Sequence, residues 1–275
     1  MFQELENKVL EKQVLFRSRN DADLYGVLYR AQGEEEGAMV ICPPDGEERI
    51  WSQRILVNFS RLLAVHGYTV FRFDYMGQGE SEGNYEESNL STRHADIESA
   101  IGFLLGQTKS NSVGLLGVRL GGTLASWVAS KDSAVKCLIL WEPILDLRGY
   151  FYNLLRVNIS FQMVMHKMVS KNREKLVEEI LGGGEVSING FNLTQALLKE
   201  AMEIKPEGFL NKFSGKLLIT LLPGSKLPVE HHRGEVVGLE FPVFWKEPKI
   251  YCTRPKTLMD ETLKWMGQNW VAGGV

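Results

Sequence analysis

The chain has few of the residues that build disulfide frameworks and metal centres. Among 275 residues there are three cysteines and five histidines, with no C-x-x-C motif and no His/Cys cluster. Cys42, Cys137 and Cys252 are odd in number and far apart, which favours reduced thiols and a cytoplasmic location over a disulfide scaffold. We therefore expect no metal and no cofactor.

Long apolar runs are also missing. None approaches the roughly 20 residues that span a bilayer, and the opening residues MFQELE are acidic, unlike a signal peptide. We expect no membrane insertion. A formal net charge of −3 gives no sign of a nucleic-acid partner. The remaining composition, 44% hydrophobic and 24% charged, is typical of a globular domain and leaves the oligomeric state open.

Short apolar runs alternate with helical periodicity along most of the chain. Strands are predicted at residues 13–19, 24–30, 38–42, 68–73, 112–116, 135–141, 216–222 and 240–245. Helices are predicted between them, one with Ser52 as its N-cap, and a last helix closes the chain at residues 259–270. This alternation predicts an α/β fold with a mostly parallel sheet covered by helices on both faces.

The alternation breaks between residues 147 and 209. Apolar residues recur there at helical spacing with no obvious strand between them, and a run of three glycines interrupts them at 182–184. We interpret this segment as a helical lid inserted into a single domain that covers residues 1–275. The alternative is a set of ordinary core helices.

Residues 117–121 read Gly-Val-Arg-Leu-Gly. The frame is that of a nucleophile elbow, G-x-S-x-G, a sharp strand-to-helix turn that leaves no room for side chains on either side of its central residue. Arg119 stands at the position of the serine. A guanidinium stays protonated at ordinary pH and cannot attack a carbonyl carbon.

The sequence of residues 67–83, GYTVFRFDYMGQGESEG, followed by this turn about 40 residues later, resembles the α/β-hydrolase superfamily. More narrowly, the chain is similar to the exosortase-system-associated "hydrolase 2" group. That resemblance implies a bacterial cytoplasmic protein linked to exopolysaccharide or protein-sorting loci, with no known substrate. The matching stretches are Cys42-Pro43-Pro44, Glu47-Glu48, Ser52, Arg54, residues 117–121, Trp141-Glu142-Pro143, residues 185–193 and Phe244-Trp245.

A serine hydrolase of this fold also needs a carboxylate and a histidine. The loop after residues 216–222 contains no carboxylate before Glu230, and no histidine follows His232. We considered Ser81, Cys42 and the pair His231-His232 as substitutes, but Ser81 is better suited to capping backbone groups, Cys42 to the core and the two histidines to a solvated loop. The serine mechanism is therefore predicted to be lost, and whether the chain is an enzyme stays open.

Charged residues follow three neighbouring strands at the edge where doubly wound folds bind ligands. Three interpretations of Arg119 remain open: an internal ion pair, an ion pair that leaves part of the guanidinium free for an anionic ligand, or a direct catalytic role. We predict that it pairs with Glu48 or, as second choice, Glu142. The candidate pocket residues are Asp45, Glu47, Glu48, Arg54, Arg119, Glu142, Asp146 and Trp245.

The sequence thus favours a triad-less hydrolase-family protein that binds or processes a small acyl or carboxylate-bearing molecule under a lid. The alternative is a non-catalytic interaction protein that uses the fold as a platform.

Overall fold

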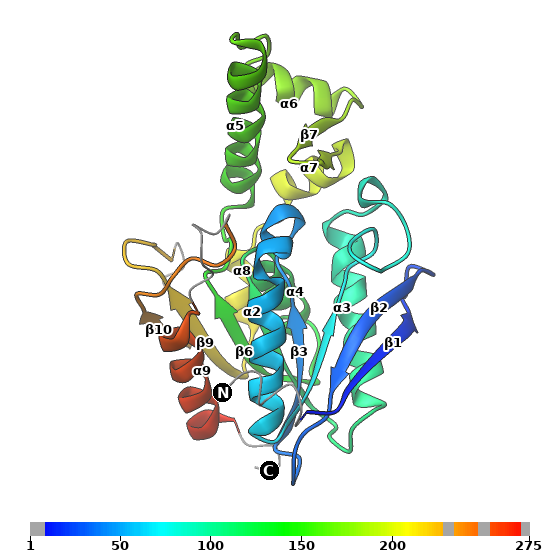
Figure 1. Ribbon diagram of the computed structural model, residues 1–275, viewed down its shortest axis with the longest axis vertical. Helices are drawn as coiled ribbons and strands as arrows, with labels where there is room; N and C mark the ends of the chain where they lie inside the picture. The colour runs from blue at the N-terminus through cyan, green and yellow to red at the C-terminus, as the bar shows by residue number, and fades with distance from the viewer. Residues whose placement is uncertain (1–8, 228–233, 247–253, 271–275) are drawn as a thin grey trace.

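The computed structural model describes residues 9–227, 234–246 and 254–270. Its centre is an eight-stranded sheet in the order β1-β2-β4-β3-β5-β6-β9-β10 (Figure 1). From β4 to β10 the strands are parallel, and β2 joins β4 and β1 in antiparallel pairs. The strands are β1 (Glu11–Arg17), β2 (Asp23–Tyr29), β3 (Gly37–Cys42), β4 (Tyr68–Phe73), β5 (Val113–Val118), β6 (Val135–Trp141), β9 (Lys216–Leu221) and β10 (Glu235–Gly238).

Helices cover both faces of this sheet, as the sequence predicts. On one face, α2 (Gly46–Val65) and α9 (Lys256–Asn269) pack their apolar residues against the strands. On the other, α3 (Leu90–Leu105), α4 (Leu120–Ala129) and α8 (Glu207–Lys212) do the same, and the short 3-10 helix η1 (Tyr85–Glu87) precedes α3. Neighbouring strand residues divide between the two cores: Leu115 faces one and Leu116 the other. Burial on both faces explains why the central strands are continuous apolar runs.

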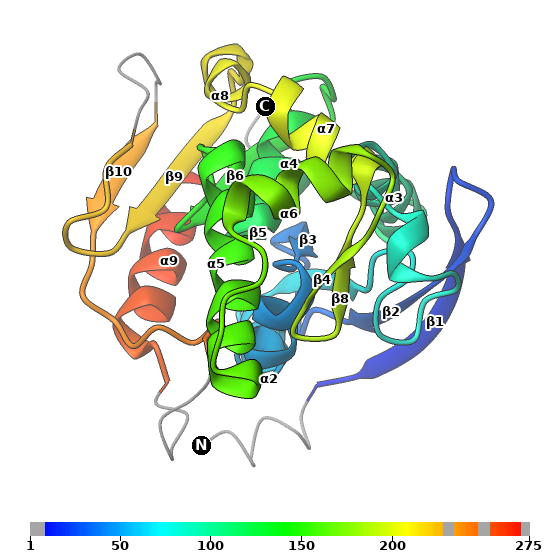
Figure 2. The same cartoon turned by 90° about the horizontal axis from the view of Figure 1, so that it is seen from above.

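The segment predicted as an insertion rises from the edge at which the parallel strands end (Figures 1 and 2). It consists of α5 (Leu147–His166), α6 (Arg173–Leu181), the strands β7 (Val186–Ile188) and β8 (Phe191–Leu193), and α7 (Gln195–Glu203). The expectation of no strand here is wrong, because β7 and β8 form an antiparallel hairpin. Its turn is Asn189-Gly190, both at positive φ, and Asn-Gly is the dipeptide that such two-residue turns favour.

Two boundaries near the site also differ from the prediction. Helix α2 begins at Gly46 rather than after Ser52, whose hydroxyl donates to the Glu48 carbonyl oxygen at 2.5 Å inside the helix. The strand predicted at 240–245 is absent, and the edge strand is β10 instead. Pro242 removes a backbone donor, and the apolar residues Phe241, Phe244 and Trp245 are buried against the α9 side of the sheet rather than paired in it.

None of the described helices combines the length and hydropathy needed to cross a lipid bilayer.

Candidate functional site

Arg119 occupies the turn between β5 and α4, with φ 55° and ψ −121°. This positive φ is uncommon for a residue that is not glycine and costs roughly 1–3 kcal/mol. The turn is tight on both sides. A side chain at Gly121 would overlap the carbonyl oxygens of Cys42 and Pro43, and one at Gly117 would overlap the backbone of Gly122. The glycines of the motif are therefore required by close backbone packing.

The guanidinium of Arg119 is held from three directions. Its Nε donates to Glu48 Oε1 at 3.2 Å, and its Nη1 donates to the Glu142 carbonyl oxygen at 3.4 Å. The guanidinium carbon lies 5.1 Å from the centre of the buried Trp245 ring, within the range of a cation–π contact. The prediction that Arg119 pairs with Glu48 is confirmed. Nη2 has no hydrogen bond to any residue that the structure describes.

Glu48 lies in the first turn of α2 and has a second partner. The hydroxyl of Tyr150, on α5, donates to its other oxygen at 3.4 Å. Burial raises the pKa of Glu48, while Arg119 lowers it and Asp45 raises it further. Burial also raises the pKa of Tyr150 well above its usual range, so this hydroxyl keeps its proton. The ion pair thus connects α2, the β5–α4 turn and the first turn of α5.

Asp45 precedes Glu48 by three residues but belongs to a different cluster. Its carboxylate accepts hydrogen bonds from Gln78 Nε2 at 2.6 Å and from the Tyr85 hydroxyl at 2.8 Å. The guanidinium of Arg93 lies 3.0 Å from the same carboxylate and is completely buried. Sequence reasoning missed Arg93, although it lies on the apolar face of α3 with Leu90 and Ile97, where a charge needs a partner.

Three other candidate residues do not reach Arg119. Glu47 accepts from Trp51 Nε1 at 3.2 Å and from the side chain of Asn189, which ties α2 to the β7–β8 turn. Asp146 is exposed and caps α5 by accepting from the Gly149 amide at 2.8 Å. Arg54 is exposed on α2 and has no ion pair within the described ranges.

Glu142 contributes its backbone rather than its carboxylate to Arg119. The carboxylate accepts from the Leu222 amide at 2.7 Å and from the Ser225 hydroxyl, so it joins the ends of β6 and β9. The alternative prediction, that the Glu142 carboxylate pairs with Arg119, is wrong, because Leu222 and Ser225 already occupy that carboxylate. Of the eight predicted residues, Arg119, Glu48, Glu142 and Trp245 meet in one place.

The described residues considered as replacements for a serine nucleophile, Cys42 and Ser81, both have structural roles. Cys42 is fully buried, and burial raises the pKa of its thiol far above the usual range. The Ser81 hydroxyl donates to the Asp74 carbonyl oxygen at 2.6 Å and accepts from a backbone amide, as predicted for a capping role. His231 and His232 lie outside the described residues.

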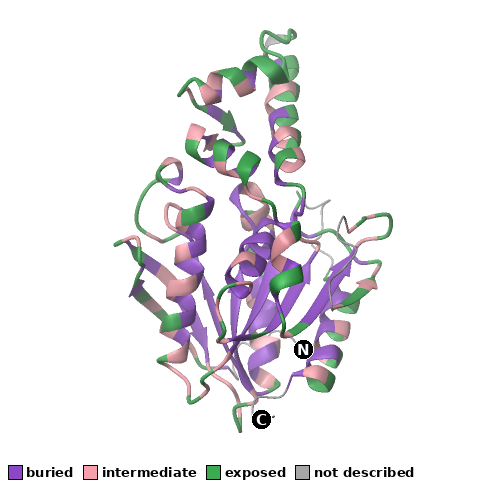
Figure 3. Ribbon diagram, turned by 180° about the vertical axis from the view of Figure 1, so that it is seen from behind, coloured by how far each residue is buried: buried purple, intermediate pink, exposed green. Residues whose placement is uncertain are grey.

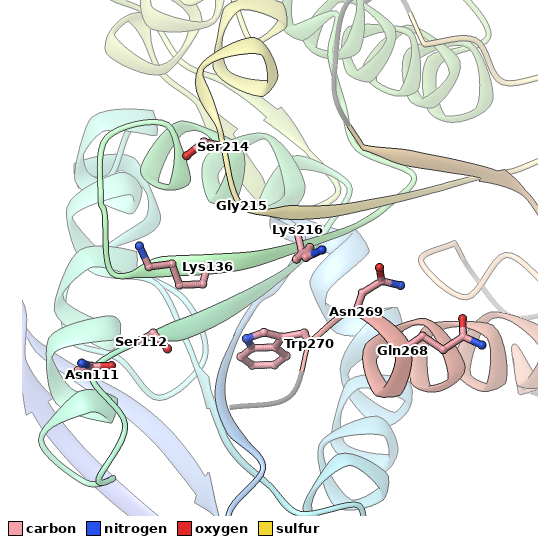
Figure 4. A pocket seen from close by; sticks show the side chains of 9 residues that line it. All are labelled: Asn111, Ser112, Lys136, Ser214, Gly215, Lys216, Gln268, Asn269 and Trp270. Atoms are coloured by element: carbon pink, nitrogen blue, oxygen red, sulfur yellow. The ribbon is translucent and has the colours of Figure 1, made fainter. Parts of the chain in front are cut away.

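A cavity of about 640 Å³ lies at the opposite edge of the sheet, where β6 and β9 begin (Figure 4). Trp270 is the one large apolar side chain in its lining, which includes none of the predicted site residues. The residues are Asn111, Ser112, Lys136, Ser214, Gly215, Lys216, Gln268, Asn269 and Trp270.

The family model described as Hydrolase_4, serine aminopeptidase S33, matches residues 47–188, just over half of the chain. The chain belongs to this family. Its matched region contains the β5–α4 turn, Glu48 and most of residues 147–209. A curated Escherichia coli protein, described as an uncharacterized 31.7 kDa protein in the traX-finO intergenic region, is 28% identical over 134 residues. The chain spans only 46% of the length of that relative.

Solved structures share the whole fold at low sequence identity. DcsB, in complex with a substrate analogue, is 14% identical with a TM-score of 0.65 over 94% of this chain and 100% of its own. The α/β hydrolase GrgF of Penicillium sp. sh18 is 14% identical with a TM-score of 0.64 over 95% and 99%. Est1E of Butyrivibrio proteoclasticus, bound to ferulic acid, is 14% identical with a TM-score of 0.63 over 93% and 98%. The predicted α/β-hydrolase fold is confirmed.

Proposed function

We propose that this α/β-hydrolase-fold protein binds a small molecule with a carboxylate or acyl group at Arg119, beneath a lid formed by residues 147–209, and that it has no Ser-His-Asp triad. The observation that carries the proposal is the incomplete hydrogen bonding of the Arg119 guanidinium. Nε faces Glu48 and Nη1 faces a carbonyl oxygen, whereas Nη2 has no partner among the described residues. A free guanidinium edge is suited to a carboxylate or phosphate oxygen.

The surroundings of Arg119 support an anion at this place. The side chain precedes α4, whose first backbone N–H groups carry the positive end of a helix dipole. Trp245 forms one apolar wall, and Tyr150 brings α5 against the Glu48 side of the pair. Est1E holds ferulic acid and DcsB holds a substrate analogue on the same fold, which supports a small-molecule ligand here.

The loss of the triad rests on three positions. The turn holds Arg119, the loop after β9 reads Leu222-Pro-Gly-Ser-Lys226 without a carboxylate, and the sequence contains no histidine after His232. Arg119 would take the place of the family's serine. Because an arginine cannot serve as an acyl acceptor at neutral pH, we assign this chain to binding, or to a reaction that does not use a serine nucleophile.

Because its motifs resemble those of the exosortase-associated group, we also propose that the protein works in a bacterial cytoplasm. We propose no nucleic-acid partner. The free, buried thiols of Cys42 and Cys137 suit a reducing compartment. A second candidate function, an interaction platform without a ligand, is favoured by exposed apolar side chains on α5 such as Val164, which is 75% exposed.

Ligand binding tests the leading proposal. Native mass spectrometry of the purified protein should detect a co-purified small acid. Ferulate and medium-chain fatty acids, added as probes, should raise the melting temperature more than their methyl esters, because only the acids present an ionised carboxylate to Arg119. Arg119→Met should weaken carboxylate binding about tenfold, because a charge-assisted hydrogen bond is lost.

Arg119→Lys separates charge from geometry, since lysine keeps the charge but loses the planar pair of donors. It should bind carboxylates with intermediate affinity. Arg54→Met, on the exposed surface of α2, is the matched control and should bind like the wild type. Equal binding of acids and esters, or equal affinity in all three variants, would remove Arg119 from the proposed site. No ligand by either method would favour the interaction platform.

Covalent chemistry gives a separate test. We expect no labelling by fluorophosphonates and negligible turnover of p-nitrophenyl esters, because nucleophile, base and acid are absent together. Arg119→Ser should also remain unlabelled, since an unactivated serine is a weak nucleophile. Stoichiometric labelling of any serine, located by peptide mass spectrometry, would contradict the proposal.

A further inference from the structure

The end of α5 is the most exposed apolar part of the described chain. We name residues 161–169 the α5 tip; it stands far from the sheet in Figure 1, and Figure 3 shows this end of the helix as exposed. Val164 is 75% exposed, Met168 63% and Phe161 56%. The other exposed apolar side chains are Met163, Met165 and Val169, with Val157 one turn before them.

These side chains are presented by an ordered structure. The one buried polar residue of the α5 tip, Gln162, turns inward: its oxygen accepts from the backbone amides of Ser170 and Lys171 at 2.9 and 3.0 Å, and its amide donates to Asn158 at 2.9 Å. These hydrogen bonds hold the turn between α5 and α6 against the end of α5. Val164 and Met165 follow Phe161 by three and four residues within α5, so the three side chains form an exposed stripe on one face of the helix. Met168 and Val169 follow directly after the helix end.

Basic residues flank the α5 tip in the sequence. Residues 156–181, through the end of α6, carry a net charge of +2 with His166 neutral: the basic residues are Arg156, Lys167, Lys171, Arg173 and Lys175, and the acidic ones are Glu174, Glu178 and Glu179. The whole chain carries −3, so the remaining residues carry −5. Lys171 is paired with Glu179 and Arg173 with Glu174. Lys167 and Lys175 have no ion pair in the part of the chain that the structure describes.

We propose that the α5 tip docks the protein on an anionic lipid surface. Exposed Phe, Val and Met side chains would enter the region between headgroups and acyl chains, and Lys167 and Lys175 would face the negative headgroups. The charge decides between occupants, because residues 156–181 of two copies, each with a net charge of +2, would repel one another if the stripes paired. The expectation of no membrane insertion concerned runs long enough to span a bilayer; shallow docking needs only one helix end.

Vesicle flotation tests this inference on the full chain. The protein should float with vesicles of phosphatidylcholine and phosphatidylglycerol, bind phosphatidylcholine alone much more weakly, and be released by high salt. V164E/M168E should reduce binding about tenfold or more, because two apolar side chains no longer enter the interface. K167E/K175E should reduce binding to the anionic vesicles about thirtyfold or more, since each lysine near such a surface contributes about 1 kcal/mol and the substitutions also add negative charge.

Leu15→Glu is the matched control, because Leu15 is an equally exposed apolar residue on β1 at the far side of the molecule. It should bind vesicles like the wild type, and all variants should keep the wild-type melting temperature because the changed side chains are exposed. A wild-type protein that does not float, or equal losses in the tip and Leu15→Glu variants, would overturn the inference. So would a wild-type dimer in analytical ultracentrifugation that Val164→Glu converts to a monomer, which would assign the tip to self-association.

Discussion

Arg93→Ala should lower the free energy of unfolding by about 3–5 kcal/mol, the range found when one partner of a buried ion pair is removed. The side chain is completely buried, 3.0 Å from Asp45 and stacked over the Tyr85 ring at 5.0 Å. Its loss would leave the Asp45 carboxylate buried with only the neutral donors Gln78 and Tyr85. Urea unfolding monitored by tryptophan fluorescence measures the effect.

Two further variants give this prediction its control. Arg19→Ala removes a surface arginine that is 64% exposed and 2.7 Å from Glu98, and should leave the unfolding midpoint nearly unchanged because surface pairs contribute little. Arg93→Met with Asp45→Asn removes both charges and should recover much of the loss. If Arg93→Ala were as stable as Arg19→Ala, the buried ion pair between Arg93 and Asp45 would not stabilise the fold.

The sequence predicts the sheet well because its signals are local. Continuous apolar runs give β4 and β6 with their exact bounds, and the G-x-x-x-G frame locates the turn at Arg119. The pairing of Arg119 with Glu48 was also predictable, since parallel strands end at one edge and a buried guanidinium needs a carboxylate. These inferences depend on topology, which the alternation of strands and helices already defines.

The errors arise where an apolar pattern serves packing rather than pairing. Phe241, Val243 and Trp245 alternate as in a strand. In the structure, however, Phe244 packs beside Trp141, and Trp245 packs beside Arg119. Asp45 and Glu48 both follow β3 in the sequence, but the N-terminus of α2 turns the two carboxylates toward different arginines. No local pattern reveals which way a side chain turns at such a junction. Arg93, in contrast, was detectable as a charge on an apolar helical face.

Arg119→Ala should lower the free energy of unfolding by about 3 kcal/mol at pH 8, near the lower end of the range for buried pairs because both side chains are 15% exposed. Alanine keeps a residue with a Cβ at φ 55°, so the backbone strain persists and the loss reports the guanidinium. Arg17→Ala, which removes an exposed partner of Asp21, is the matched control and should unfold like the wild type.

The pH dependence of this loss follows from Glu48. Burial already raises the pKa of its carboxyl, and removing Arg119 deletes the main interaction that lowers it. A carboxyl with a raised pKa in the folded state binds a proton more tightly when folded, so stability falls as pH rises from the unfolded pKa through the folded one. The deficit of Arg119→Ala should therefore be largest at pH 8 and smaller near pH 5, and in a Glu48→Gln background it should shrink at both. A deficit that is independent of pH and persists with Glu48→Gln would mean that Arg119 stabilises the turn through Trp245 and the Glu142 carbonyl, and not through the ion pair.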